Sequence, residues 1–319
     1  MSKYYLEFEK PIKELDEKLI ALRVNVEPES ESAEEIKHLQ DKRENVIKKI
    51  FKKLSRWQRV QLARHPNRPY CLDYIQRWSP DFLELHGDRH FADDSAVITG
   101  MGSIDDRPVM YIGQQKGRNT KENLHRNFGM MRPEGYRKAL RVMKLAEKFH
   151  VPVISLIDTP GAYPGIGAEE RGQGEAIAKN LLEMSRLKTP LISVVIGEGA
   201  SGGALGIGVS DKMLMLENTW YSVISPEGCA SILWHDSSKA PDAAEALQVI
   251  PEDLRKMGIC DRIIQEPLGG AHRDYDTAAD ILKAVLLEEL DVLKDVPPDA
   301  FLERRIEKYD RLGVFLEGA

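Results

Sequence analysis

Two glycine-rich turns, at residues 159–167 and 197–204, carry the strongest chemical signal in this sequence. Each follows an apolar run and precedes a helical pattern. The first turn of a helix leaves backbone N–H groups unpaired, the helix dipole adds partial positive charge, and glycine lets a substrate approach closely. Such turns suit an oxyanion, whether an enolate, a tetrahedral intermediate or a phosphate. Because two turns occur at matching places, the pattern favours a functional cleft over glycines that only permit tight packing.

The second turn also fits a different chemistry, that of a serine hydrolase. Gly199-Ala200-Ser201-Gly202-Gly203 matches the G-x-S-x-G pattern of a nucleophile elbow, in which Ser201 would attack the substrate. Such an enzyme needs an acid and a histidine downstream, and Asp261 and His272 are the candidates. A serine among glycines arises easily, so this motif alone is weak and the hydrolase stays an alternative.

A basic stretch is the third feature with chemical potential. Residues 116–144 hold nine positive and two negative side chains, in a chain whose formal net charge is −6. Lys116 and Arg118 lie beside glycine after an expected strand, so we expect them to bind a phosphate or carboxylate of a ligand. The later charges fit a solvated helix face. The stretch lacks the regular aromatic interleaving that would favour nucleic-acid binding, and the acidic net charge argues against such binding.

Composition limits the class of protein. The chain has 319 residues, of which 42% are hydrophobic and 30% are charged, as in a soluble globular protein of about two domains. No apolar run reaches the roughly 18 residues of a membrane helix, and the N-terminus is acidic where a signal peptide would be apolar. The three cysteines and the histidines show no metal-ligand spacing. We therefore expect a cytoplasmic protein without a metal site.

Alternating strands and helices must position the two turns. Apolar runs at 151–158 and 190–198 predict buried strands that close on Asp158 and Glu198. Runs at 96–100 and 108–113 predict paired strands around Asp105-Asp106, with further strands at 213–216 and 220–224. We expect helices over about 133–150 and 169–188. This alternation predicts an α/β fold with a parallel sheet.

The first 55 residues follow a different pattern. Apolar residues recur at three- and four-residue steps on both sides of an acidic break at 27–32, which predicts a helical hairpin. Its apolar stripe must be covered by the main domain or by another chain. A scaffold that only recruits partners through this hairpin is a further, non-catalytic alternative. The chain from about residue 278 is expected to be a mostly helical, charged tail.

Long strings in these segments resemble the α subunits of bacterial acetyl-CoA carboxylase carboxyltransferases. The resemblance covers essentially the whole chain, and its longest strings are Ile157-Asp158-Thr159-Pro160-Gly161-Ala162-Tyr163-Pro164-Gly165, Gly197-Glu198-Gly199-Ala200-Ser201-Gly202-Gly203-Ala204-Leu205 and Tyr221-Ser222-Val223-Ile224-Ser225-Pro226-Glu227-Gly228-Cys229-Ala230-Ser231-Ile232-Leu233-Trp234. Ala200 is one departure, since glycine is expected there. Alanine keeps its N–H, so the departure matters only if that residue needs positive φ.

The resemblance implies a fold and a domain division. The fold would be α/β and crotonase-like (ClpP/crotonase), a superhelix of stacked β-β-α units with an N-terminal helical hairpin and a helical C-terminal tail. Residues 1–55 would form the hairpin extension. Residues 56–296 would form a CoA carboxyltransferase C-terminal-type domain, and residues 297–319 the helical tail.

The resemblance also implies an activity. The enzyme would transfer the carboxyl group of N-carboxybiotin, held on a biotin carboxyl carrier protein, to acetyl-CoA, giving malonyl-CoA for fatty acid biosynthesis. A carboxyltransferase β subunit, in an α2β2 assembly, would complete the active site between the two subunits. A separate biotin carboxylase would consume the ATP, and no metal is implied in this chain.

The resemblance places the chemistry on main-chain amides. The N–H groups of Gly202 and Gly203 would stabilise the negative charge on the ureido oxygen of biotin. Gly161 and Ala162 would line the other side of the site, and Gly199-Ala200 would also contact substrate. Biotin that has lost its carboxyl group would deprotonate the acetyl methyl group, so no side-chain base is required.

Overall fold

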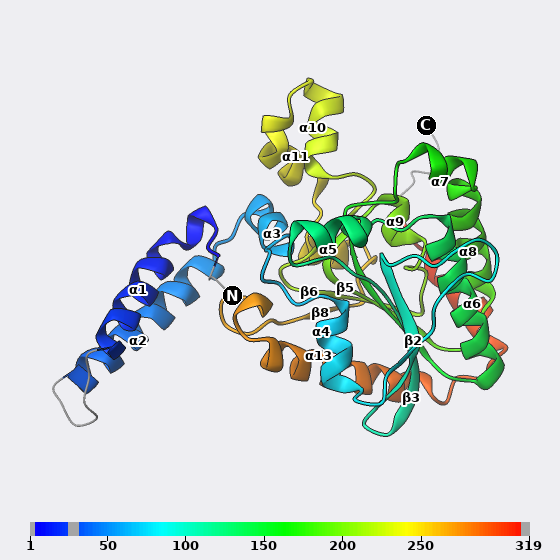
Figure 1. The fold of residues 1–319 in the computed structure, drawn as a ribbon, viewed down its shortest axis with the longest axis horizontal. Helices are drawn as coiled ribbons and strands as arrows, with labels where there is room; N and C mark the ends of the chain where they lie inside the picture. The colour runs from blue at the N-terminus through cyan, green and yellow to red at the C-terminus, as the bar shows by residue number, and fades with distance from the viewer. Residues whose placement is uncertain (1–3, 25–31, 314–319) are drawn as a thin grey trace.

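The computed structural model describes residues 4–24 and 32–313, and Figure 1 shows a layered body from which a helical hairpin projects. The hairpin consists of α1 (Lys10–Val24) and α2 (Ser32–Phe51), which pack against each other after the short helix η1 (Glu7–Glu9). Ile12 and Ile47 are buried in it. The predicted hairpin is confirmed, although residues 27–31 of its acidic break lie outside the described residues.

An eight-stranded mixed sheet forms the centre of the body, in the order β1-β2-β3-β4-β5-β6-β8, with β7 paired to β5. The strands are β1 (Leu83–Glu84), β2 (Val97–Ile104), β3 (Arg107–Gln114), β4 (Val153–Thr159), β5 (Leu191–Ala200), β6 (Lys212–Leu216), β7 (Trp220–Ser222) and β8 (Arg262–Ile264). Asp105 and Asp106 have φ of 46° and 62°, as a two-residue hairpin turn between antiparallel β2 and β3 requires. From β3 onward the pairs are parallel, as expected.

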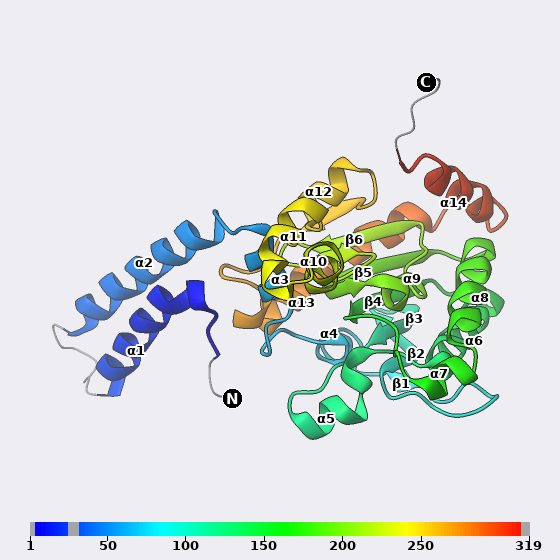
Figure 2. The same cartoon turned by 90° about the horizontal axis from the view of Figure 1, so that it is seen from above.

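Helices cover both faces of the sheet, which is the layering of an α/β fold. Figure 2 shows this sandwich from above. Ile154 and Leu156 of β4 face a core shared with α4 (Cys71–Trp78) and α13 (Tyr275–Leu293). Val153 and Ile157 face the opposite core, shared with α6 (Pro133–Phe149) and α8 (Gln173–Arg186). This alternation follows from the two-residue period of a strand.

The remaining helices lie mainly at the ends of the strands. They are α3 (Arg56–Ala63), α5 (Thr120–His125), α7 (Ile166–Glu170), α9 (Ser201–Leu205), α10 (Pro226–Trp234), α11 (Ala240–Leu247), α12 (Pro251–Lys256) and α14 (Ala300–Asp310), with short 3-10 helices η2 (Asn127–Gly129), η3 (Ser237–Lys239) and η4 (Ala271–Arg273). Within residues 4–24 and 32–313, no helix combines the length and the apolar character of a membrane span.

Two sequence-based boundaries were wrong. The helix expected over 169–188 is divided into α7 and α8, because Gly172 adopts a left-handed conformation with φ 82° between them. The strand expected over 220–224 is only the three-residue β7. The helical tail is confirmed for α14, whose fully buried Arg305 donates to Asp211 at 2.8 Å and to the Thr189 carbonyl at 2.6 Å.

Candidate active site

The two glycine turns meet at the carboxyl edge of the parallel sheet. Thr159 of β4 lies in register with Gly199 of β5, so the turns leave the sheet side by side. A Cβ atom added at Gly203 would lie 2.3 Å from the carbonyl carbon of Gly161 and 2.7 Å from the nitrogen of Ala162. Only glycine fits at position 203, because those neighbours are backbone atoms. The structure therefore brings Gly161, Ala162 and Gly203 into one site.

The N–H groups of Gly202 and Gly203 lie in the first turn of α9, directly after β5. Amides at that position have no earlier helical turn to supply their acceptors. Ala200 precedes them with φ −104°, so alanine is accommodated there without strain. Ser201 has φ 57° and Gly161 has φ 150°. The sharp change of direction from strand to helix is therefore taken up at Ser201.

A buried charge cluster lies beneath the turns. Lys116 Nζ lies 2.6 Å from Asp158 Oδ1 and 2.8 Å from Glu198 Oε2. Arg64 Nε lies 2.5 Å from the other oxygen of Glu198, and its guanidinium also contacts Glu227. The sequence placed both acids at strand ends but did not predict that they share Lys116. The sequence did hold one signal of this contact, because the two acids occupy equivalent positions at the ends of strands that turn out to be parallel neighbours.

Burial and pairing set the ionisation of this cluster. Burial raises the pKa of Asp158, and Lys116 only partly offsets that effect. Burial would also raise the pKa of Glu198, but Lys116 and Arg64 outweigh it and the pKa is lowered. The two carboxylates in turn overcome the desolvation of Lys116 and raise its pKa. Lys116 is thus a buried cation that holds the ends of two strands together.

Arg118 is held by the protein on several sides. Its guanidinium donates to the carbonyls of Pro66 at 3.0 Å and Arg68 at 2.8 Å, contacts Asp73, and lies 3.9 Å from the centre of the Tyr70 ring. Lys116 and Arg118 both line a cavity of about 350 Å³ next to Glu198. Their internal partners indicate a structural role, and ligand binding by either residue stays a prediction.

The serine hydrolase alternative is not supported. Asp261 Oδ2 accepts from the Met213 N–H and from Lys308 Nζ, each at 2.6 Å. His272 lies at another location, where its ring stacks on His65 with centroids 4.0 Å apart. Both residues make structural contacts elsewhere in the fold, so neither forms a catalytic triad with Ser201.

Glu9, His65 and His272 form a buried cluster that the sequence did not predict. Their potential ligand atoms lie within 4.8 Å of one another, so they are the described residues that could hold a metal ion. However, Arg273 Nη2 already lies 2.6 Å from Glu9 Oε1, and the two stacked imidazoles are inclined by only 28°, which does not aim their nitrogens at one point. Burial lowers the pKa of His65 to about 3. The cluster is better described as a neutral-imidazole contact that anchors the start of the hairpin to the body.

Comparison with solved structures supports the fold class. Transcarboxylase 12S, solved with methylmalonyl-coenzyme A bound, matches with a TM-score of 0.57 and 20% identity over 71% of this chain and 42% of that chain. A Pseudomonas malonate decarboxylase hetero-tetramer solved with coenzyme A matches with a TM-score of 0.59 and 16% identity over 75% of this chain and 93% of that chain. These structures confirm the predicted crotonase-like α/β fold.

Sequence comparison identifies the family. The family described as "Acetyl co-enzyme A carboxylase carboxyltransferase-like" matches residues 5–313. The acetyl-coenzyme A carboxylase carboxyl transferase subunit alpha of Halorhodospira halophila is 56% identical over 98% of this chain and 99% of its own length. The subunit alpha of Xanthomonas campestris pv. campestris is 57% identical over 99% of each chain. This chain therefore belongs to the acetyl-coenzyme A carboxylase carboxyltransferase family.

Proposed function

We propose that this chain is the α subunit of a carboxyltransferase that moves a carboxyl group from carboxybiotin to acetyl-CoA, giving malonyl-CoA for fatty acid biosynthesis. The observation that carries the proposal is the contact of Gly203 with Gly161 and Ala162, which unites two amide-rich turns. The relatives described above are named acetyl-coenzyme A carboxylase carboxyl transferase subunit alpha, which supports the proposal. Because the hydrolase alternative is not supported, Ser201 is not assigned the role of a nucleophile.

Main-chain amides supply the proposed catalysis. Carboxybiotin on its carrier protein brings the carboxyl group, a ureido oxygen that gains negative charge, and afterwards the base for the acetyl methyl proton. The N–H groups of Gly202 and Gly203 donate to that oxygen. Gly161 and Ala162 line the opposite wall, and Gly199-Ala200 shape the floor, where Gly199 lies in register with Tyr221. Loss of one such donor typically costs about 2.7–4 kcal/mol of barrier.

The end of the body that carries α9 supports a role in a complex. Ile166 of α7 and Val223 before α10 are 79% and 82% exposed, and Ile232 and Leu233 of α10 are 67% and 62% exposed. Figure 1 shows α7 and α10 at the same end as α9. A contiguous exposed apolar patch is typical of a docking surface, and Ile232 and Leu233 are consecutive residues of α10. We assign this surface to a carboxyltransferase β subunit, in an α2β2 assembly that works in the cytoplasm with biotin carboxyl carrier protein and biotin carboxylase.

A reconstitution experiment tests the proposal. This chain, mixed with its β partner, is assayed for carboxylation of free biotin that depends on malonyl-CoA. Activity that requires both subunits is expected, and an assembled but inactive complex would overturn the assignment. Deletion of residues 1–55 is expected to weaken assembly, because the hairpin projects from the body, and light scattering would measure the mass. An unchanged mass would remove the hairpin from the assembly interface.

A further inference from the structure

The side-chain amide of Gln114 bridges the two glycine turns. Gln114 is the last residue of β3 and is fully buried. Its Nε2 donates to the carbonyl of Gly203 at 2.8 Å, and its Oε1 accepts from the N–H of Asp158 at 3.0 Å. We propose that Gln114 is a positioning residue that sets the spacing of the turns and so aims the Gly202 and Gly203 amides. This inference rests on the proposed function.

The two bonds explain why the residue is a glutamine. One planar group must donate to a carbonyl and accept from an N–H at the same time, and a side-chain amide does both. A glutamate carboxylate would still accept from Asp158 N–H but would place an acceptor against the Gly203 carbonyl. A methionine of similar length would leave both backbone groups without this partner. Asparagine carries the same amide on a side chain one methylene shorter.

Neighbouring contacts show that α9 is held at both ends. Asn180 of α8 donates from Nδ2 to the carbonyl of Gly206 at 2.9 Å, just beyond the end of α9. Glu198 N–H donates to Asp158 Oδ1 at 3.0 Å, which ties β5 to β4 near the charge cluster. Gln114 thus contributes the contact that joins the end of β3 to the first turn of α9. Removing it frees that turn while the other contacts remain.

The main test is Gln114→Met in the assembled complex. A misplacement of about 1 Å costs on the order of 100-fold in rate, so we expect kcat for biotin carboxylation to fall about 10- to 100-fold. The KM for malonyl-CoA is expected to change by less than about threefold, because the substitution lies beneath the amides that act in the transition state. A merely structural role would lower stability without this split between kcat and KM.

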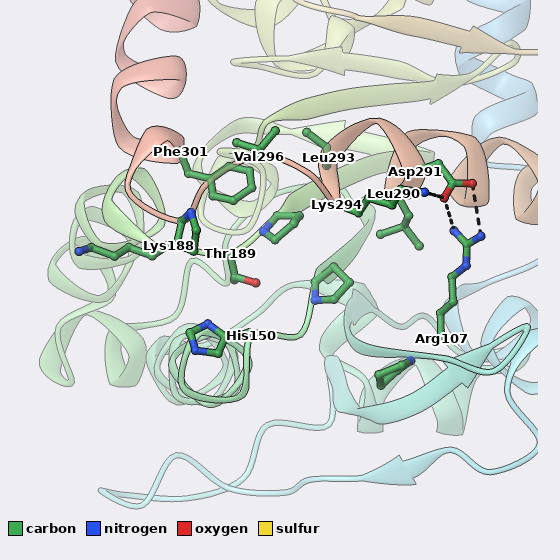
Figure 3. Close-up of a pocket in the computed structure, with 14 residues that line it drawn as sticks. Arg107, His150, Lys188, Thr189, Leu290, Asp291, Leu293, Lys294, Val296 and Phe301 are labelled. Carbon is green, nitrogen blue, oxygen red and sulfur yellow. Dashed lines mark hydrogen bonds and ion pairs between the residues drawn. The ribbon is translucent and has the colours of Figure 1, made fainter.

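Thr189→Val is the matched control. Thr189 is buried and its Oγ1 donates to the carbonyl of Val151 at 2.8 Å, so this substitution also removes a buried side-chain bond to backbone. Thr189 lines a cavity of about 530 Å³ between the end of α13, the start of β3 and the segments that lead into β4 and β5. Figure 3 shows Thr189 there, at the opposite end of the strands from the glycine turns. We expect a comparable fall in Tm with kcat within about twofold of the wild type.

Gln114→Glu is a second, independent test of the positioning role. A protonated carboxylic acid can donate to the Gly203 carbonyl while accepting from Asp158 N–H, whereas its ionised form cannot. The activity of this variant relative to wild type is therefore expected to rise as the pH falls. Wild-type kcat in Gln114→Met, or an equal loss in Thr189→Val at matched stability, would overturn the inference. Inactivity of the wild-type complex itself would instead refute the proposed function and remove the basis of the inference.

Discussion

A methyl group at position 203 is the smallest change that tests whether the two glycine turns form one site. In Gly203→Ala, the new Cβ would lie 2.3 Å from the carbonyl carbon and 2.5 Å from the oxygen of Gly161. Ordinary contact begins near 3.4 Å, so the turns must separate by about 1 Å. The neighbours are backbone atoms, and rotation of a side chain cannot relieve the clash.

That displacement sets the expected loss of activity. A shift of about 1 Å costs on the order of 100-fold in rate, which corresponds to about 2.7 kcal/mol of barrier. Overpacking is expected to cost about 1–3 kcal/mol of folding free energy as well. The assay is biotin carboxylation dependent on malonyl-CoA, with the variant assembled with its β partner and its complex mass checked by light scattering.

Two glycine-to-alanine variants calibrate this loss. Gly174→Ala in α8 introduces a Cβ with no heavy atom within 4 Å, and we expect wild-type activity. Gly202→Ala places its Cβ 3.3 Å from the flexible Cδ1 of Ile177 and keeps its N–H, so a loss of less than about tenfold is expected. A folded, assembled Gly203→Ala complex with full activity would refute the reasoning that the turns must stay in contact.

Three further substitutions test other parts of the account. Ser201→Ala is expected to keep carboxyl transfer within about threefold in the same assay, since the proposed mechanism uses no hydroxyl nucleophile. Near-complete loss in a folded, assembled variant would show that the Ser201 hydroxyl takes part in the transfer. Lys116→Met leaves Asp158 and Glu198 buried without their shared cation. We therefore expect the free energy of unfolding, measured by urea titration, to fall by about 3–5 kcal/mol. An unchanged midpoint of urea unfolding would contradict the structural role of the cluster. Because the pKa of His65 falls from 6.5 to about 3 on folding, the unfolded chain binds more protons at acidic pH. As the pH falls below 6.5, this group is therefore expected to lower the free energy of unfolding by up to about 1.4 kcal/mol per pH unit. His65→Gln should flatten that slope. An identical slope in the variant would contradict the burial argument.

The sequence predicted those elements whose signals are local. Continuous apolar runs marked β4 and β5, and Asp105-Asp106 marked the turn between β2 and β3. Gly172 divides a helix that was predicted to be continuous, because it adopts the left-handed conformation. The sequence did not show this break, since the helical periodicity continues on both sides of Gly172. Period alone does not reveal such a break.

The site was only partly predictable for a related reason. Glycine-rich turns after strands are visible in the sequence, and their meeting at Gly203 follows from parallel neighbouring strands. The partners of Lys116 and Arg118 are not visible there, because Asp158, Glu198 and Asp73 approach them only through the tertiary fold. A basic residue beside glycine therefore suggested ligand binding, whereas the structure first shows internal ion pairs.

The most direct test of the account is a crystal structure of the complex of this chain and its β partner with biotin bound. Stabilising donors should lie about 2.7–3.1 Å from the oxygen on which charge develops. We expect the ureido oxygen at that distance from the backbone nitrogens of Gly202 and Gly203. Biotin bound away from these nitrogens, or both amides bonded to other protein atoms in that complex, would contradict the central claim.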